Sequence, residues 1–246
     1  LNILFGKGID SVNGEDHVES VTIAGEIIPT DIVVMAVGVR PYSELGEKAG
    51  LKTERGALLV DERMETSVKD IYAIGDCAQS FSGVDGKPSY VALATTAFKQ
   101  ASVAGVNAAG GDVVFNGNLG TFVSYIGNLE ISCTGYNSAA AEKNGFKIVS
   151  GRANMVIKPN WMPGAKDISI KLVVDAGTGR ILGGQAIGEE GAAWRMNVVA
   201  LAIKQKMTIQ EFSTIELAYC PAVSEVFDPL LVAADIAIRR FSRSRK

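Results

Sequence analysis

The feature that most constrains this chain is a short apolar segment, Ile71–Ile74, that leads directly into the pair Gly75-Asp76. We expect this segment to be a buried strand of an α/β sheet. Ligands of such sheets collect at the carboxyl ends of the strands, where an acidic residue holds the hydroxyl groups of a sugar or ribityl chain. Gly75 has no side chain to collide with a ligand, and Asp76 supplies an acceptor. The segment predicts a cofactor site, although an ordinary Gly-Asp turn after a buried strand has the same dipeptide.

A longer stretch of sequence favours a cofactor site over an ordinary turn. The segment Thr66–Asp76 resembles the second flavin-binding motif of the pyridine nucleotide-disulfide oxidoreductase family, whose members have two dinucleotide-binding domains. Asp31–Pro41 is similar to the stretch in which that family's nicotinamide domain returns to the flavin domain, and Tyr90–Gly105 is similar to its flavin-facing helix. Leu217–Pro221 and Asp228–Ala234 resemble the interface domain of the branch that contains NADH oxidases and coenzyme A-disulfide reductases.

The resemblance implies a mixed α/β and α+β fold, namely the carboxyl-terminal part of a two-dinucleotide-domain flavoprotein reductase plus its α+β dimerisation domain. We expect residues 1–40 to be a remnant of the NAD(P)H-binding domain, 41–114 the carboxyl-terminal part of the FAD-binding domain, and 115–246 the dimerisation (interface) domain. The family's two Gly-x-Gly-x-x-Gly turns and its redox cysteine do not occur here. Because the chain also starts at Leu1 rather than a methionine, we expect the carboxyl-terminal portion of a longer reductase.

The pattern of apolar residues predicts the elements. The first forty residues indicate a hairpin over 18–28 and a buried strand over Asp31–Val37. A short helix near 43–49 and a strand at 57–60 are expected next. Beyond the composition shift at 110–120 we expect strands at 129–134, 147–157, 168–174 and 181–187, with a hairpin through 175–180, a helix over 194–206 and a capping box at Thr208–Glu211.

A helix of small residues is expected over Val91–Ala109, and its amino end presents unpaired N–H groups and a partial positive charge. In the resembled family this end points at the pyrimidine edge of the flavin. The resemblance therefore implies backbone contacts to FAD from Ala92, Leu93 and Ala94, in addition to Gly75 and Asp76. A plain packing helix is the alternative. Ala92 stands where the family commonly has proline, and Phe98 stands where asparagine is common.

Tyr219 is the side-chain candidate near the carboxyl end, because a phenol combines a hydroxyl with an apolar ring. The resemblance places a tyrosine here that reaches into the partner subunit's active site. Taken by itself, a tyrosine such as Tyr219 is more often a packed interface residue, and the Ala-Tyr-Cys-Pro context makes the two readings equally compatible. The coenzyme A-dependent branch commonly has a second tyrosine and a basic residue further on, where this chain has Val223 and Phe227, which weakens a coenzyme A-specific assignment.

Composition limits the other classes of function and location that this chain can have. A formal net charge of −3 argues against a nucleic-acid-binding surface, and no apolar run approaches the ~20 residues of a membrane span. The basic tail Arg239–Lys246 is expected to be a solvated, frayed terminus. Three distant cysteines (Cys77, Cys133 and Cys220) suit a reducing compartment, so we expect a cytoplasmic protein with structural cysteines. With His17 as the single histidine, metal chemistry is not expected.

These observations lead to one main hypothesis. The parent protein is an FAD-dependent NAD(P)H oxidoreductase of the NADH oxidase or coenzyme A-disulfide, persulfide or polysulfide reductase type, and a homodimer. It acts on a small disulfide, persulfide, peroxide or oxygen, without nucleic acid or membrane partners. This chain supplies the second FAD-binding segment and the dimer interface. The alternative is a non-catalytic dimerisation fragment that lacks flavin and activity as an isolated chain.

Overall fold

The computed structural model describes residues 2–244, which divide into two compact units with a boundary between Arg40 and Pro41. The first unit is an antiparallel sheet of β1 (Ser11–Asn13), β2 (Ser20–Ile23) and β3 (Glu26–Pro29), in the order β1-β2-β3. The turn from β2 to β3 has two left-handed residues, Ala24 at φ 51° and Gly25 at φ 81°. Two such residues are typical of a tight hairpin turn. The predicted hairpin is confirmed.

The predicted buried strand over Asp31–Val37 is wrong. This segment has no regular secondary structure, and Ile32, Val34 and Val37 are 77%, 81% and 83% exposed. Apolar side chains favour a strand only where a neighbouring strand satisfies the backbone groups. Within residues 2–40, no strand pairs with this segment.

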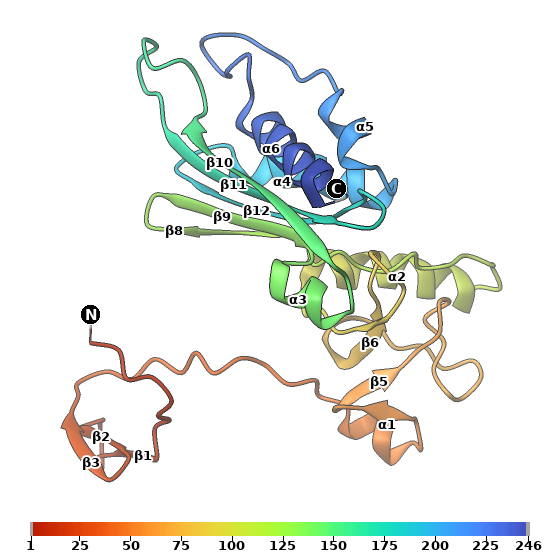
Figure 1. Cartoon of the computed structure of the whole chain (residues 1–246). Helices are drawn as coiled ribbons and strands as arrows, with labels where there is room; N and C mark the ends of the chain where they lie inside the picture. The colour runs from red at the N-terminus through yellow and green to blue at the C-terminus, as the bar shows by residue number, and fades with distance from the viewer. Residues whose placement is uncertain (1, 245–246) are drawn as a thin grey trace. The chain divides into compact units, whose positions relative to one another are not determined.

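The second unit begins with a small four-stranded sheet and two helices (Figure 1). The strand order is β4-β5-β6-β7, and only the β5–β6 pair is parallel. The elements are α1 (Glu44–Lys48), β4 (Thr53–Glu54), β5 (Ala57–Leu59), β6 (Ala78–Phe81), β7 (Pro88–Ser89) and α2 (Ala94–Ala108). The expected short helix near 43–49 is confirmed, and the strand expected at 57–60 ends one residue early.

The predicted strand over Ile71–Ile74 is also wrong. Tyr72 forms a single antiparallel bridge with Glu65, and Ile71 is exposed rather than buried. A 3-10 turn, η1 (Gly75–Cys77), follows, and the strand β6 begins only after it. The segment is extended at Ile74, but the described residues give it no continuous partner strand. Pairing, rather than the apolar pattern, decided where the strand formed.

The remainder of the chain is built on a five-stranded antiparallel sheet with the order β10-β11-β12-β9-β8. The strands are β8 (Phe122–Ile126), β9 (Leu129–Gly135), β10 (Ile148–Val156), β11 (Asp167–Asp175) and β12 (Ile181–Gly188). All four strands predicted in this region are confirmed within one residue at each end, and so is the hairpin between β11 and β12. The edge strand β8 was not predicted.

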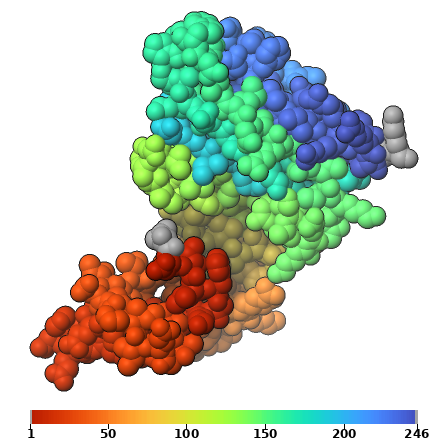
Figure 2. Space-filling view, turned by 60° about the vertical axis from the view of Figure 1, so that its left-hand side comes forward, coloured from red at the N-terminus to blue at the C-terminus, as the bar shows by residue number. Residues whose placement is uncertain are grey.

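Four helices accompany this sheet: α3 (Ser138–Lys143), α4 (Ala192–Lys204), α5 (Ile209–Ser213) and α6 (Pro229–Ser244). The sheet residues Gly151, Leu172 and Gly184 lie side by side across three strands. Gly184 faces Met196 of α4, and Gly151 faces the backbone of α6. Both long helices therefore cover the same face (Figure 1), and the main hydrophobic core lies between them and the sheet. The outer side of α6, dark blue in Figure 2, is part of the molecular surface.

The structure confirms some of the predictions for these helices and contradicts another. The predicted helix over 194–206 is α4, which begins and ends two residues earlier, and Thr208 and Glu211 form the predicted capping box of α5. The expectation of a frayed tail is wrong as far as Ser244, because α6 runs to that residue and Phe241 is only 4% exposed. Arg245 and Lys246 lie outside the described residues. No helix in the described part of the chain is both long and apolar enough to cross a membrane.

Candidate cofactor site

The candidate site is built around the tight turn at Gly75. Ile74 is extended, with φ −142° and ψ 164°, and Gly75 then takes the left-handed conformation, with φ 71°. A Cβ atom added to Gly75 would lie 3.4 Å from the Cβ of Ala97 on α2. The turn therefore requires glycine for its conformation and brings its backbone into van der Waals contact with the helix.

Two hydrogen bonds hold the turn against the neighbouring segment. The backbone N–H of Gly75 donates to Oε1 of Gln100 at 2.7 Å, and the side chain of Gln100 is almost wholly buried. The hydroxyl of Tyr90 donates to the backbone carbonyl of Asp76 at 2.8 Å. Burial, followed by the charge of Asp76, raises the pKa of Tyr90, so this phenol stays a proton donor at neutral pH. The turn is fixed to α2 and to the segment before it.

The amino end of α2 is open. Leu93 is the N-cap residue, Ala94 is the first helical residue, and no side chain caps the first turn. The first backbone N–H groups of a helix have no partner within the helix, and the helix dipole adds a partial positive charge there. The helix begins three residues later than predicted, because the chain is still extended at Leu93, with φ −135° and ψ 135°. Ala92 and Leu93 thus precede the helix, and Ala94 begins it.

The structure brings four of the predicted cofactor-site positions onto two adjoining segments: Gly75 and Asp76 on the turn, and Leu93 and Ala94 at the start of the helix packed against it. Asp76 and Ala94 are exposed. Such an arrangement offers an acceptor for hydroxyl groups and N–H donors for an electronegative atom, with no side chain at Gly75 to obstruct a ligand. The residues present fit the ribityl and ring portions of a flavin.

Tyr219 stands apart from this turn. Its side chain is 50% exposed and precedes a turn at Cys220–Ser224. Ser224 fixes that turn, because its Oγ donates to the carbonyl of Ala218 at 3.0 Å and accepts from the N–H of Cys220 at 3.1 Å. Within residues 2–244, no hydrogen bond or ion pair links Tyr219 to Gly75 or Asp76. The tyrosine lies on an exposed loop with Val223 and Phe227.

Sequence reasoning missed Gln100 and Tyr90. The buried residues of α2 are Thr96, Gln100, Ala104 and Asn107, which lie on one helical face. Two amide side chains on an otherwise small-residue buried face indicate polar partners across the contact. The spacing of these residues in the sequence could therefore have indicated that Gln100 bonds to a polar partner. No comparable pattern marks Tyr90.

All three cysteines are free in the described part of the chain, and Cys220 is exposed. The thiol of Cys77 donates to the carbonyl of Ile74 at 3.3 Å. Burial raises the pKa of Cys133, which disfavours its thiolate. The surroundings of Cys77 and Cys133 are typical of structural cysteines. Among residues 2–244 no group of His, Cys, Asp and Glu side chains is placed to hold a metal.

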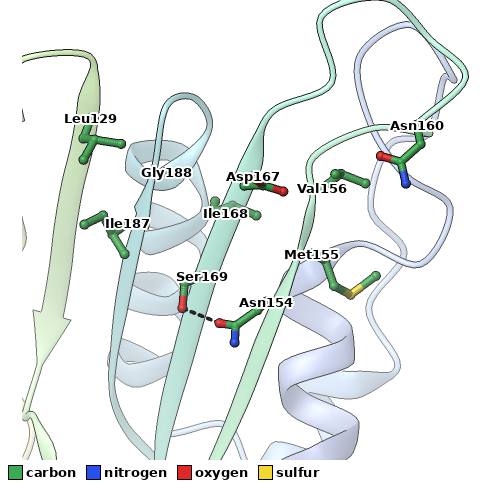
Figure 3. A pocket seen from close by; sticks show the side chains of 10 residues that line it. All are labelled: Leu129, Asn154, Met155, Val156, Asn160, Asp167, Ile168, Ser169, Ile187 and Gly188. Carbon is green, nitrogen blue, oxygen red and sulfur yellow. Dashed lines mark hydrogen bonds between the residues drawn. The ribbon is translucent and has the colours of Figure 1, made fainter.

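A separate cavity of about 760 Å³ lies on the five-stranded sheet, on the face opposite the helices (Figure 3). Asn154, Ser169 and Ile187 occupy neighbouring strands there, and the hydroxyl of Ser169 donates to Oδ1 of Asn154 at 2.7 Å. This hydrogen bond uses the amide oxygen of Asn154 and the hydroxyl of Ser169, and apolar side chains make up much of the remaining lining.

The fold and this turn-and-helix geometry define a class: a mixed α/β protein with a glycine turn set against an open helix end, followed by an antiparallel sheet covered by helices. Two family models match successive parts of the chain. The pyridine nucleotide-disulphide oxidoreductase model matches residues 1–101, and the model of that family's dimerisation domain matches residues 122–231. The chain belongs to the pyridine nucleotide-disulphide oxidoreductase family.

Individual relatives agree. An NADH oxidase of Methanocaldococcus jannaschii is 36% identical, over 98% of this chain and 54% of that protein. A solved NAD-dependent persulfide reductase from A. fulgidus has a TM-score of 0.91 at 34% identity, over 98% of this chain and 45% of that one. A solved FAD-dependent pyridine nucleotide-disulphide oxidoreductase from Desulfovibrio vulgaris has a TM-score of 0.78 at 32% identity, over 96% of this chain and 56% of that one. The chain spans about half the length of the relatives it matches.

Proposed function

We propose that this chain supplies the second FAD-binding segment and the dimer interface of an FAD-dependent NAD(P)H oxidoreductase. The observation that carries the proposal is the turn at Gly75 held against the open end of α2 by Gln100. The dimerisation-domain match and the FAD-dependent relative support it. A bound FAD would supply the chemistry of hydride acceptance from a nicotinamide and of electron transfer to an acceptor.

Asp76 binds the sugar-like part of the cofactor in this proposal. Its carboxylate is exposed beside the turn, where it accepts hydrogen bonds from ribityl hydroxyl groups. Gly75 leaves the backbone accessible, and Tyr90 keeps the carbonyl of Asp76 turned toward the protein. The carboxylate therefore stays available to the ligand.

The open end of α2 stabilises negative charge on the flavin. Backbone N–H groups at Ala94 and the following residues lie at the positive end of the helix dipole. Such a charge, fixed before the reaction, favours the reduced ring more than the oxidised ring. Ala92 and Leu93 contribute backbone contacts next to this helix end.

Tyr219 acts across a homodimer. Its exposed loop carries several apolar side chains, and a large exposed apolar patch is typical of an interaction site. In the dimer the phenol of one protomer lines the pocket of its partner. Oxygen and small sulfur compounds such as persulfides are the proposed acceptors, since the relatives include an NADH oxidase and a persulfide reductase. Three free cysteines in the described residues support a reducing, cytoplasmic location.

The visible absorption spectrum, together with the intact mass, tests the proposal. Flavin bands at the mass of these 246 residues support the Gly75-Asp76 site. The variant Asp76→Ala is expected to retain at least tenfold less FAD, whereas Asp235→Ala, an exposed carboxylate of α6, retains as much as the parent chain. A colourless chain of the correct mass overturns cofactor binding by this chain and favours the dimerisation fragment without flavin.

A further inference from the structure

A second cavity, of about 830 Å³, lies between α2 and the five-stranded sheet with its helices. Its walls come from the loop between β6 and β7, the middle of α2, the stretch 114–119, the end of the β11–β12 hairpin and the end of α4. Small-molecule sites are typically concave and of this size. The cavity does not include any residue of the candidate cofactor site.

Positive charge dominates the lining. Lys99, Arg180, Lys204 and Lys206 contribute cationic side chains, and Asp85 is the one carboxylate among the described lining residues. Arg180 and Lys206 come together through backbone pairing, because Arg180 forms a bridge with Thr208 and the N–H of Ile181 donates to Met207 at 3.1 Å. The fold therefore gathers cations that are far apart in the sequence.

The charge of Asp85 is balanced in part from outside the cavity. Its Oδ1 accepts a hydrogen bond from the hydroxyl of Tyr136 at 2.8 Å. Its Oδ2 lies 3.7 Å from Nζ of Lys87 and is buried without a hydrogen-bond partner among the described residues. Since Lys87 is outside the lining, at most one of the four lining cations is needed to neutralise this carboxylate. The charge of the others is available to a ligand.

Arg180 supplies a donor without an acceptor. Its Nε is buried and has no hydrogen-bond partner among the residues that the structure describes. A buried donor left unpaired costs about 1–3 kcal/mol, so its presence in a cationic cavity indicates an anionic ligand that accepts from it. The planar guanidinium matches the oxygen atoms of a phosphate group.

We propose that this cavity binds a phosphorylated small molecule of nucleotide size. The phosphate groups contact Arg180, Lys204 and Lys206. The apolar part of the ligand contacts Val103, Phe115 and Leu119, which line the same cavity. This site is independent of the proposed flavin site, and of any reaction there.

Calorimetric titration of the full chain with ADP at low salt tests the inference. We expect saturable binding of one ADP per chain, and at least tenfold weaker binding by the double variant Lys204→Gln/Lys206→Gln. Both lysines are exposed, so the fold tolerates the change. The single variant Arg180→Gln is expected to weaken binding at least fivefold. The control Lys52→Gln/Lys69→Gln, which also removes two exposed lysines, keeps the parent affinity within twofold.

Four results would overturn the inference. The first is no saturable heat with millimolar ADP, and the second is an unchanged affinity in the Lys204/Lys206 double variant. The third is binding of adenosine as tightly as ADP, which would exclude a role for the phosphates. The variant Asp76→Ala separates the two proposals, because it alters the flavin site and leaves ADP affinity unchanged. Loss of ADP binding in this variant, the fourth result, would place ADP at the flavin site and contradict the second cavity.

Discussion

At the scale of single residues, Gln100 is the polar contact on which the candidate site depends. Its amide oxygen accepts the N–H of Gly75 from inside the molecule, where water does not reach that oxygen. A buried backbone donor must have a partner, so the turn requires an acceptor at the position of Gln100. The helix is thereby fixed in register against the turn, which sets the distance between its open end and Asp76.

Replacement of Gln100 by alanine is expected to lower the free energy of unfolding by about 1–3 kcal/mol, because the N–H of Gly75 loses its buried acceptor. Urea unfolding followed by circular dichroism measures this change. Gln205→Ala, at an exposed position, is the control and is expected to stay within about 0.5 kcal/mol of the parent chain. An equal effect of the two substitutions would show that the contact with Gly75 contributes nothing.

At the scale of elements, α6 packs closely against β10. A Cβ atom on Gly151 would collide with the carbonyl oxygen of Ala233 and contact Ala237. The helix therefore rests directly on the strand backbone. Close contact of this kind requires small residues on both sides, and α6 supplies alanines at the matching positions.

Gly151→Ala is expected to destabilise the fold by about 1–3 kcal/mol or more, because α6 must move away from β10 to admit the methyl group. Thermal unfolding provides the measurement. Gly105→Ala is the matched control: Gly105 lies within α2 with open space around it, so alanine there is expected to stabilise by about 0.5–1 kcal/mol. The same glycine-to-alanine change is thus expected to lower stability at Gly151 and to raise it at Gly105. Similar melting temperatures for the two variants would contradict the contact.

The capping box of α5 predicts a pH dependence. Hydrogen bonds from the backbone N–H and the hydroxyl of Thr208 lower the pKa of Glu211, so the fold favours its ionised form. The contribution of this carboxylate to folding stability is therefore fully present above the unfolded-state pKa of about 4.3. It is lost as the pH falls through the lower pKa of the folded state. Glu211→Gln is expected to be less stable than the parent chain at pH 7 and to approach it as the pH falls through the folded-state pKa of Glu211.

Urea unfolding at several pH values measures this convergence. The control Glu216→Gln changes an exposed carboxylate on the segment that follows α5 and is expected to show no such trend. A stability difference for Glu211→Gln that is the same at every pH would contradict the role of the carboxylate.

The sequence predicted the regular elements of the larger sheet well, because β9 to β12 combine apolar alternation with clear turns. Strand prediction failed where the presence of a partner strand decides whether a strand forms. Asp31–Val37 and Ile71–Ile74 have the apolar composition of buried strands, yet the described chain gives neither a continuous partner strand. The Gly75-Asp76 turn was predicted from its dipeptide and resemblance. Its attachment through Gln100 depends on a contact between segments 25 residues apart, which local patterns do not reveal.

At the scale of the whole molecule, the proposed dimer requires a surface that one chain leaves exposed. The loop that carries Tyr219 has such a surface, with Phe227 71% exposed. Nζ of Lys158 donates to the carbonyl of Ala222 at 3.4 Å, which joins the loop of the exposed Trp161 to the same surface. Burial of large aromatic side chains contributes most of the energy of many protein interfaces.

Phe227→Asp is expected to convert the dimer to a monomer, because a buried, unpaired carboxylate costs far more than the phenyl ring contributes. Sedimentation velocity at several concentrations measures the mass in solution. Leu45→Asp, which alters a comparably exposed apolar residue on α1, is expected to leave the dimer intact. A dimer of unchanged strength in the Phe227 variant would exclude this surface, and a parent chain that is monomeric at all concentrations would contradict the dimer itself.

The position of α6 in the sequence also has a consequence for biosynthesis. The ribosome makes β10 and β11 well before it reaches Pro229, yet α6 covers the apolar face of both strands. At roughly 5–20 residues per second, translation leaves this face open to other nascent chains for several seconds. Chaperones that bind apolar segments are therefore expected to associate with the emerging polypeptide during this interval and to leave it once α6 docks.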